Sequence, residues 1–200
     1  MSSPLAQAIE NLTSDDARVR EAAARNVYGE GRKRADLAAQ SWWSNAELSS
    51  LLHAPSPIVT VGIAVPPATF DAIRVANDSP RLAEVPQDQD AREFELHFPD
   101  GIALDVLTSR EPGESGAIAR YLAKFGAGIQ QVEFQCRDVD RATAIMQEKF
   151  GIAPVYPATR PGADGTRINF FLVSAPEAGK VLIELYERSP AAQGSPVTPR

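Results

Sequence analysis

The sequence predicts an α+β fold in which two βαβββ modules form one curved mixed sheet around a cavity, after a helical N-terminal extension. Two observations support this fold class. The same order of expected elements, a strand, a helix and three strands, occurs twice, at about residues 58–108 and 129–187. Residues 4–53, in contrast, are expected to be helical, because their longest segment is rich in Ala, Arg, Glu and Leu.

The extension, residues 1–53, carries recognisable helix signals. Ser14, which two aspartates follow, is expected to cap a long helix. Gly29 and Gly31 have poor helix propensity, so we expect this helix to be broken there. Asn45 is expected to cap a last short helix that runs to Leu52.

An Ala-rich stripe and the adjacent Trp42 and Trp43 indicate that the extension packs on the sheet domain or across a homodimer. The proline-rich residues 54–57 are expected to form a linker at the start of the sheet domain, residues 54–188. Residues 189–200 contain three prolines and are expected to be a disordered tail.

Within the sheet domain, apolar patterns predict the elements in order. The first module is expected to contain a strand at 58–65, a helix at 68–76 and strands at 81–85, 91–98 and 102–108. A helix at 115–124 connects the modules. The second is expected to contain a strand at 129–136, a helix at 139–150 and strands at 153–158, 167–173 and 181–186.

Because successive side chains of a strand point to opposite faces, each strand offers one set to the helices and another to the cavity. In strand 91–98 the cavity set is Glu93, Glu95 and His97. The Pro-Asp-Gly turn that follows predicts a three-residue hairpin loop with Gly101 in the left-handed conformation. This register places Glu95 opposite Asp105.

The second module offers a similar set of polar side chains. Strand 129–136 is expected to turn Gln131, Glu133 and Gln135 toward the cavity. In the last hairpin, the expected set is Arg167, Asn169 and Phe171 on one arm, with Leu182, Glu184 and Tyr186 opposite. Carboxylates crowded in a cavity raise one another's pKa or bind a cation, and either outcome suits acid–base chemistry.

Composition excludes several classes of protein. The 200 residues are 44% hydrophobic, enough for a sizeable core, and the net charge of −6 leaves no basic face for nucleic acid. No apolar run approaches the length of about 18 residues that a membrane span needs. The start lacks the features of a secretory signal, and the single Cys136 lies in an apolar strand pattern, as expected for a buried thiol. A cytoplasmic protein without nucleic-acid or membrane partners is therefore expected.

Three phrases carry a family resemblance: Gly126-Ala-Gly-Ile-Gln-Gln-Val, Gly165-Thr-Arg-Ile-Asn-Phe and Val181-Leu-Ile-Glu-Leu. With the helix between the first two, they resemble the second module of the methylmalonyl-CoA epimerase family. That family belongs to the vicinal oxygen chelate superfamily, with glyoxalase I and the extradiol dioxygenases. The resemblance implies the paired-module fold and gives Glu184 the place of a metal ligand beside the reacting carbon.

The resemblance also implies four metal-ligand positions, and this sequence has a carboxylate at only two of them. The two family histidines fall on Thr60 and Gln131, whereas the oxygen ligands fall on Asp105 and Glu184. His97 is left as one nitrogen donor on a neighbouring strand. Without both imidazoles, we expect no metal or a weakly bound divalent cation, Mg²⁺ or Ca²⁺ rather than Zn²⁺, Fe²⁺, Co²⁺ or Ni²⁺.

Two functions remain open. The first is an isomerase or lyase that removes a proton next to the carbonyl or thioester of a small organic acid or acyl-CoA, with Glu184 or Glu95 as the base. The predicted substrate-binding residues are Arg167, Asn169, Gln131, Tyr186 and Glu133, and Arg167 with Asn169 would stabilise the enolate-like oxygen. The alternative is a non-catalytic binding protein, like the resistance proteins of the superfamily, which sequesters a small molecule. In either case the expected partners are a small molecule and a second copy of the chain in a homodimer.

Overall fold

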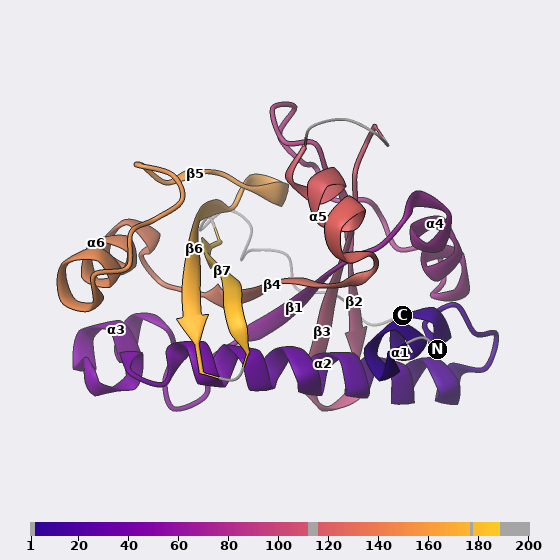
Figure 1. The fold of residues 1–200 in the computed structure, drawn as a ribbon, viewed down its shortest axis with the longest axis horizontal. Helices are drawn as coiled ribbons and strands as arrows, with labels where there is room; N and C mark the ends of the chain where they lie inside the picture. Colours follow the sequence, from indigo (N-terminus) through magenta and orange to yellow (C-terminus); the bar gives the residue numbers. More distant parts are fainter. Residues whose placement is uncertain (1–2, 112–115, 177, 189–200) are drawn as a thin grey trace, which may run out of the picture.

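The computed structural model describes residues 3–111, 116–176 and 178–188, which form one curled sheet with helices around it (Figure 1). The expected tail at 189–200 lies outside these residues. Across the described ranges, no helix combines the length and the apolar character that a bilayer crossing requires.

The sheet joins two modules edge to edge. Its strands are β1 (Val59–Ala64), β2 (Arg92–Phe98), β3 (Ile102–Thr108), β4 (Gly128–Gln135), β5 (Arg160–Pro161), β6 (Arg167–Ala175) and β7 (Gly179–Glu187). Their order is β2-β3-β1-β4-β7-β6-β5, and the modules meet where β1 and β4 pair antiparallel. The predicted α+β fold of paired modules is confirmed.

One strand in each module differs from the prediction. Residues 81–85 form no strand, and a hydrogen bond of 2.9 Å from Ala83 N to Glu93 O joins them to β2. Pro80 and Pro86 flank this segment, and proline cannot donate to a ladder. Residues 153–158 also form no strand. A single bridge there joins Pro154 to Phe171, and the short β5 follows.

The helices are α1 (Pro4–Asn11), α2 (Ala17–Ala39), α3 (Ala46–Leu51), α4 (Pro67–Ala76), α5 (Ala117–Phe125) and α6 (Val139–Phe150). Asn45 caps α3 as predicted, through a bond from Leu48 N to its side chain. The cap of α2 is Asp16 rather than Ser14. The Ser14 hydroxyl instead accepts from Asp16 N, while the Asp16 carboxylate accepts from Arg18 N.

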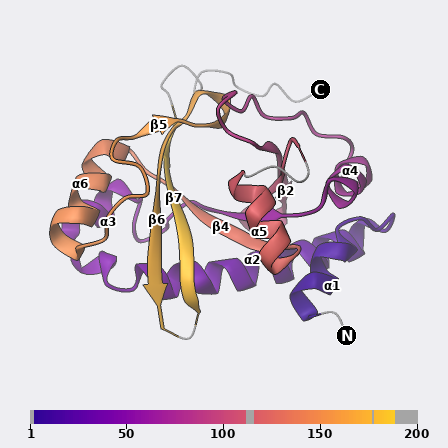
Figure 2. The same ribbon diagram turned by 45° about the horizontal axis from the view of Figure 1, so that its top comes forward.

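The predicted break of the long helix is wrong, because α2 runs unbroken through both glycines. It lies along the outer face of the sheet beneath both modules, and contacts β1, β3, β4, β6 and β7 (Figures 1 and 2). Gly31 is buried against Val61 of the central strand β1, so the helix axis approaches the sheet closely there. After α2, the fully buried Trp42 packs on Phe134 with ring centroids 5.8 Å apart.

These two glycines give a matched pair of substitutions. Gly29→Ala is expected to raise the free energy of unfolding by about 0.5–1 kcal/mol, because alanine favours helix and nothing lies within 4 Å of its Cβ position. Gly31→Ala is expected to lower it by roughly 1–3 kcal/mol, because its Cβ would lie 2.5 Å from both Val61 methyl groups. Urea unfolding of both variants measures the difference. Equal stabilisation by both would contradict the close approach of α2 to β1.

Candidate functional site

The inner face of the sheet encloses a cavity of about 870 Å³. Six of the seven described strands contribute lining residues and β1 lies beneath the cavity, while α5 closes one end through Ile118 and Arg120. The carboxyl groups that line it within the strands are those of Glu93, Glu95, Asp105, Glu133 and Glu184. The cavity is therefore strongly acidic at its base.

Strand register brings these side chains together. Glu95 of β2 lies opposite Asp105 of β3, as predicted, and Asp105 lies beside Gly62 of β1. On the other side of β1, Glu133 of β4 lies beside Glu184 of β7. Gly62 provides room at the centre, since a Cβ there would lie 2.5 Å from the side chain of Gln131.

Gln131 connects the two carboxyl groups of the second module. Its Nε2 donates to Glu133 Oε1 at 3.0 Å and to Glu184 Oε2 at 2.7 Å. Gln131 and Glu133 are almost fully buried, whereas Glu184 remains partly open to the cavity. The amide thus holds two acidic side chains in fixed positions at the base of the cavity.

A bulge in β4 adds a residue to the cavity wall that the alternation of side chains along the strand does not predict. The register between β1 and β4 shifts between Gly62 and Ile63, so Gln130 has no opposite residue, and it lines the cavity next to Gln131. Its Oε1 is buried and has no hydrogen-bond partner among the described residues. Simple alternation contains no signal for a bulge, so the sequence does not predict this position.

Burial and mutual repulsion raise the pKa of several of these carboxyl groups. Burial is the main cause for Glu93, whose pKa rises to about 7, and neighbouring carboxylates raise it further. Burial likewise raises the pKa of Glu133 to about 8, against the opposing effect of its bond from Gln131. Burial and nearby carboxylates also raise the pKa of Asp105 and of Glu184. Protons are therefore retained in this cluster near neutral pH.

The predicted catalytic residue Glu95 lines the cavity but lies toward its edge. Its side chain is 39% exposed, and its Oε2 lies at hydrogen-bond distance, 3.1 Å, from His97 Nε2. Glu93, two residues earlier on the same face, is less exposed and has the raised pKa. The alternation of side chains along the strand predicts that Glu93 and Glu95 share one face. Only the structure shows that Glu93 is the more buried of the two. The predicted Tyr186 is buried in the cavity wall, and burial raises its pKa to about 12.

The predicted placement of Arg167 and Asn169 in the cavity is wrong. In the last hairpin Phe170 lies opposite Glu184 and Ile168 opposite Tyr186, so these two residues face the cavity instead. Residues directly opposite in an antiparallel pair share a face, and the prediction had assigned β6 the other parity.

On the other face, both side chains have structural partners. Arg167 donates to Asp140 Oδ2 at 2.5 Å and to Thr159 Oγ1 at 2.9 Å. Asn169 is fully buried and its Nδ2 donates to Tyr156 O at 3.2 Å. Neither side chain is therefore available to a ligand in the cavity.

The donor set at the implied metal positions does not fit a transition metal. Within residues 3–111, 116–176 and 178–188, no three His, Cys, Asp or Glu side chains converge as metal ligands. Gln131 presents its amide nitrogen to both carboxyl groups, and a nitrogen that donates is not a metal ligand. His97 is 67% exposed and turned to Glu95. The predicted set of Asp105, Glu184, Gln131 and His97 is thus not assembled around a common point.

Comparison with solved structures finds methylmalonyl-CoA epimerases with a similar fold. Methylmalonyl-CoA epimerase from Mycobacterium tuberculosis is similar at 33% identity and a TM-score of 0.54, over 68% of this chain and 90% of that one. A variant of Streptomyces coelicolor methylmalonyl-CoA epimerase, in complex with 2-nitronate-propionyl-CoA, is similar at 30% identity and a TM-score of 0.52 over 67% and 98%. A methylmalonyl-CoA epimerase in complex with methylmalonyl-CoA and NH4⁺ matches at 29% identity and a TM-score of 0.52, over 68% and 96%. A scan against protein families and a search of curated proteins found no match.

Proposed function

Because the chain belongs to the methylmalonyl-CoA epimerase family of the vicinal oxygen chelate superfamily, we propose that it epimerises an acyl-CoA by moving a proton at the carbon next to the thioester. The observation that carries this proposal is a pair of carboxyl groups, Glu93 and Glu184, which line one cavity from different modules of the sheet. They extend from β2 and β7, which the three strands β3, β1 and β4 separate. An epimerase must remove a proton from one face of a carbon and deliver one to the other face, which two separate carboxyl groups suit.

The pKa shifts support a division of roles. With a pKa of about 7, Glu93 is partly ionised near neutral pH and takes the proton from the α-carbon. The electron pair of that C–H bond moves to the thioester oxygen as an enolate. Glu184, whose pKa burial raises, supplies a proton to the opposite face of the carbon. Proton transfer in the other direction exchanges the two roles.

The enolate oxygen needs hydrogen-bond donors, and this cavity offers carboxylic acids in that role. Burial raises the pKa of Asp105 and of Glu133, so both retain protons that can be donated. A carboxylic acid held neutral in an apolar site is an effective donor to a developing oxyanion. The proposed reaction therefore uses the residues of this chain and includes no step through a metal.

The acyl-CoA class of substrate is supported by the charge of the cavity rim. Four arginines line it, namely Arg81, Arg120, Arg160 and Arg188. Arg81 and Arg160 pair with Asp164 and Asp88, whereas Arg120 and Arg188 form no ion pair among the described residues and can approach an anionic group. The acyl-CoA molecules bound by the neighbouring structures are 2-nitronate-propionyl-CoA and methylmalonyl-CoA. Cations at the rim and acids at the base would orient such a ligand with its reacting carbon inward.

The test is the fate of the α-proton of methylmalonyl-CoA in D₂O, with and without EDTA. We expect the purified protein to incorporate deuterium at that carbon and to interconvert the epimers, at rates that EDTA leaves unchanged. Mass spectrometry measures the exchange, and chiral chromatography measures the inversion. Metal analysis of the same sample gives its content of Zn, Fe, Co and Ni, which we expect to be far below stoichiometric.

Two results would change the proposal. Saturable binding of methylmalonyl-CoA without any exchange would favour the sequestering protein that the sequence left open. Activity that EDTA abolishes and Co²⁺ or Zn²⁺ restores would show that ligand binding rearranges the site around a metal.

A further inference from the structure

Two segments from opposite edges of the sheet meet over the mouth of the cavity. The first arm, residues 78–90, precedes β2 at one edge, and the second arm, residues 159–166, contains β5, the strand at the other edge. We call the pair the strap. Residues of both arms line the cavity, among them Arg81, Asp88, Arg160 and Asp164. The strap therefore bridges the two open edges of a sheet that is otherwise a half-barrel.

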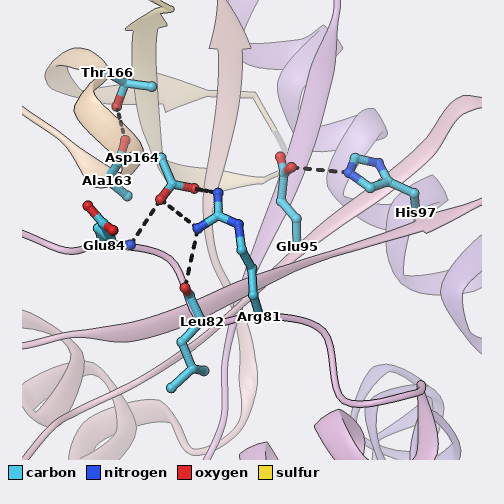
Figure 3. A network of polar contacts seen from close by, with 8 residues as sticks. All are labelled: Arg81, Leu82, Glu84, Glu95, His97, Ala163, Asp164 and Thr166. Atoms are coloured by element: carbon cyan, nitrogen blue, oxygen red, sulfur yellow. Dashed lines mark hydrogen bonds and ion pairs between the residues drawn. The ribbon is translucent and has the colours of Figure 1, made fainter. Parts of the chain in front are cut away.

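The strap is held by a cluster of polar contacts around Asp164 (Figure 3). The Arg81 guanidinium donates twice to this carboxylate, from Nη1 to Oδ1 at 2.9 Å and from Nη2 to Oδ2 at 2.6 Å. Glu84 N donates to the same Oδ1 at 2.9 Å, and Asp164 N donates in return to Glu84 O at 3.1 Å. These bonds, led by that from Arg81, keep the pKa of Asp164 below its usual value. Two other contacts cross the mouth, from Gln89 Nε2 to Pro161 O and between Arg160 and Asp88.

The arms contribute almost nothing to the hydrophobic core. No hydrophobic side chain between residues 74 and 90, or between 147 and 167, is fully buried. Val85, which packs partly against the small cluster under α5, marks where the first arm rejoins the body. Arg110 fixes the same place by donating to Val85 O and Ala91 O. Segments with exposed polar contacts and few buried apolar ones open at low free-energy cost.

Both arms also contain backbone conformations typical of hinges. Asp78 and Ser79 are consecutive residues with positive φ, 60° and 52°, at the start of the first arm. In the second arm Asp164 has φ of 51° and is followed by Gly165 at 73°. Left-handed conformations are sparsely populated by residues other than glycine, and they concentrate at functional and switching segments. A few such residues at the end of an element are enough to absorb a hinge motion.

From these observations we infer that the strap is a gate, which opens at the Arg81–Asp164 pair to admit ligand and closes over it. Its opening joins the cavity to solvent along the line between the two modules. A closed strap keeps water from an enolate formed in the cavity, which protects that intermediate. The nature of the ligand follows from the proposed function, but the motion of the strap does not depend on it.

The first test is hydrogen exchange of the ligand-free protein. Asp164→Asn removes the charge while keeping a residue that tolerates the left-handed conformation. We expect amide exchange in residues 81–85 and 162–166 to become about fivefold faster, the effect of losing one well-formed exposed ion pair. Glu47→Gln is the matched control, because Glu47 makes an equally exposed two-bond pair with Arg141 on the outer surface. It should leave exchange in the strap unchanged.

The second test measures ligand entry by stopped flow, with propionyl-CoA as the probe. Asp164→Asn should raise both its association and dissociation rates several-fold, and Arg81→Gln, which breaks the pair from the other side, should do the same. A protein with Glu84→Cys and Asp164→Cys should cross-link on oxidation and admit the probe at least tenfold more slowly until reduced. The native Cys136 is buried and stays out of this reaction.

Three results would overturn the gate. Exchange in the strap that is the same in Asp164→Asn and Glu47→Gln would show that the pair does not hold it. Unchanged probe kinetics in the cross-linked protein would show that ligand enters elsewhere. Unchanged probe kinetics in both Asp164→Asn and Arg81→Gln would show that the pair does not control entry. If propionyl-CoA does not bind the wild type at all, the proposed function fails, while the exchange experiment still decides whether the strap opens.

Discussion

Glu93→Gln is expected to slow α-proton exchange by about 10²–10⁴-fold, the usual contribution of a positioned acid–base group. Glutamine keeps the shape of the side chain and removes the group that accepts the proton. The fold should tolerate the change, because the pKa of about 7 shows that burial already disfavours the charge of Glu93. Exchange in D₂O followed by mass spectrometry, together with urea unfolding, separates loss of activity from loss of stability.

Two variants sharpen this prediction. Glu95→Gln, on the same face of β2 but 39% exposed and paired with His97, should change the rate by less than about tenfold. Glu184→Gln should abolish inversion yet leave one epimer able to exchange its proton through Glu93. If Glu95→Gln were inactive and Glu93→Gln active, the base would be Glu95, one of the two bases that the sequence predicted.

The pH profile follows from the same group. Glu93 must be ionised to accept a proton, and its raised pKa places that ionisation at about 7 instead of near the usual 4.5. The rate should therefore rise as pH increases through 7 and fall again above about 8, where Glu133 loses the proton that it donates to the enolate oxygen. In Glu93→Gln the residual rate should lose this step.

Deleting residues 1–52 is expected to leave the rest of the chain insoluble or unfolded. Five large side chains of the extension are fully buried, namely Ile9, Leu12, Trp42, Leu48 and Leu52. At about 1.5–3 kcal/mol for each, their burial is worth roughly 10 kcal/mol. That is comparable to the whole stability of a typical domain, about 5–15 kcal/mol. The deletion would also expose the outer face of the sheet around Val61 and Phe134, which aggregates when uncovered.

Solubility after expression and size-exclusion chromatography test this deletion. The finer variants Trp42→Ala and Trp43→Ala test its basis, because Trp42 is fully buried and Trp43 is only partly so. The first should cost about 3–5 kcal/mol in the free energy of unfolding and the second clearly less. A deletion variant as soluble and as cooperative in unfolding as the full chain would show that the sheet domain is self-sufficient.

The two hairpins show when the sequence pattern of a strand predicts which side chains face the cavity and when it does not. The turn between β2 and β3 contains Asp100 and Gly101, both with positive φ, so its geometry sets the register and Glu95 lies opposite Asp105 as predicted. The last hairpin has both faces covered, one by α2 and α6 and the other by the cavity walls. Polarity therefore does not tell the faces apart: Asn169 is fully buried on the helix side, while Phe170 lines the cavity.

Depth in the cavity was beyond sequence reasoning for a different reason. Alternation gives the face of a side chain but not its distance from the rim, so Glu93 and Glu95 were equivalent until β2 was placed in the sheet. The strap was equally hidden, because its two arms are about 80 residues apart in the sequence and meet through the bond from Arg81 to Asp164. At the metal positions, Thr60 and Gln131 stand where the family resemblance implies imidazoles, and the expectation of no metal or a weakly bound cation remains a prediction.

The position of α2 beneath both modules also determines when this helix can pack during synthesis of the chain. Residues 17–39 leave the ribosome early, yet this helix contacts β6 and β7, whose residues 167–187 are among the last to be made. Its apolar stripe must therefore wait for most of the chain before its complete docking surface exists. During synthesis the stripe is exposed for the seconds needed to translate the remaining residues, at about 5–20 residues per second. The helix that contacts both modules in the finished fold therefore lacks part of its docking surface until synthesis is nearly complete.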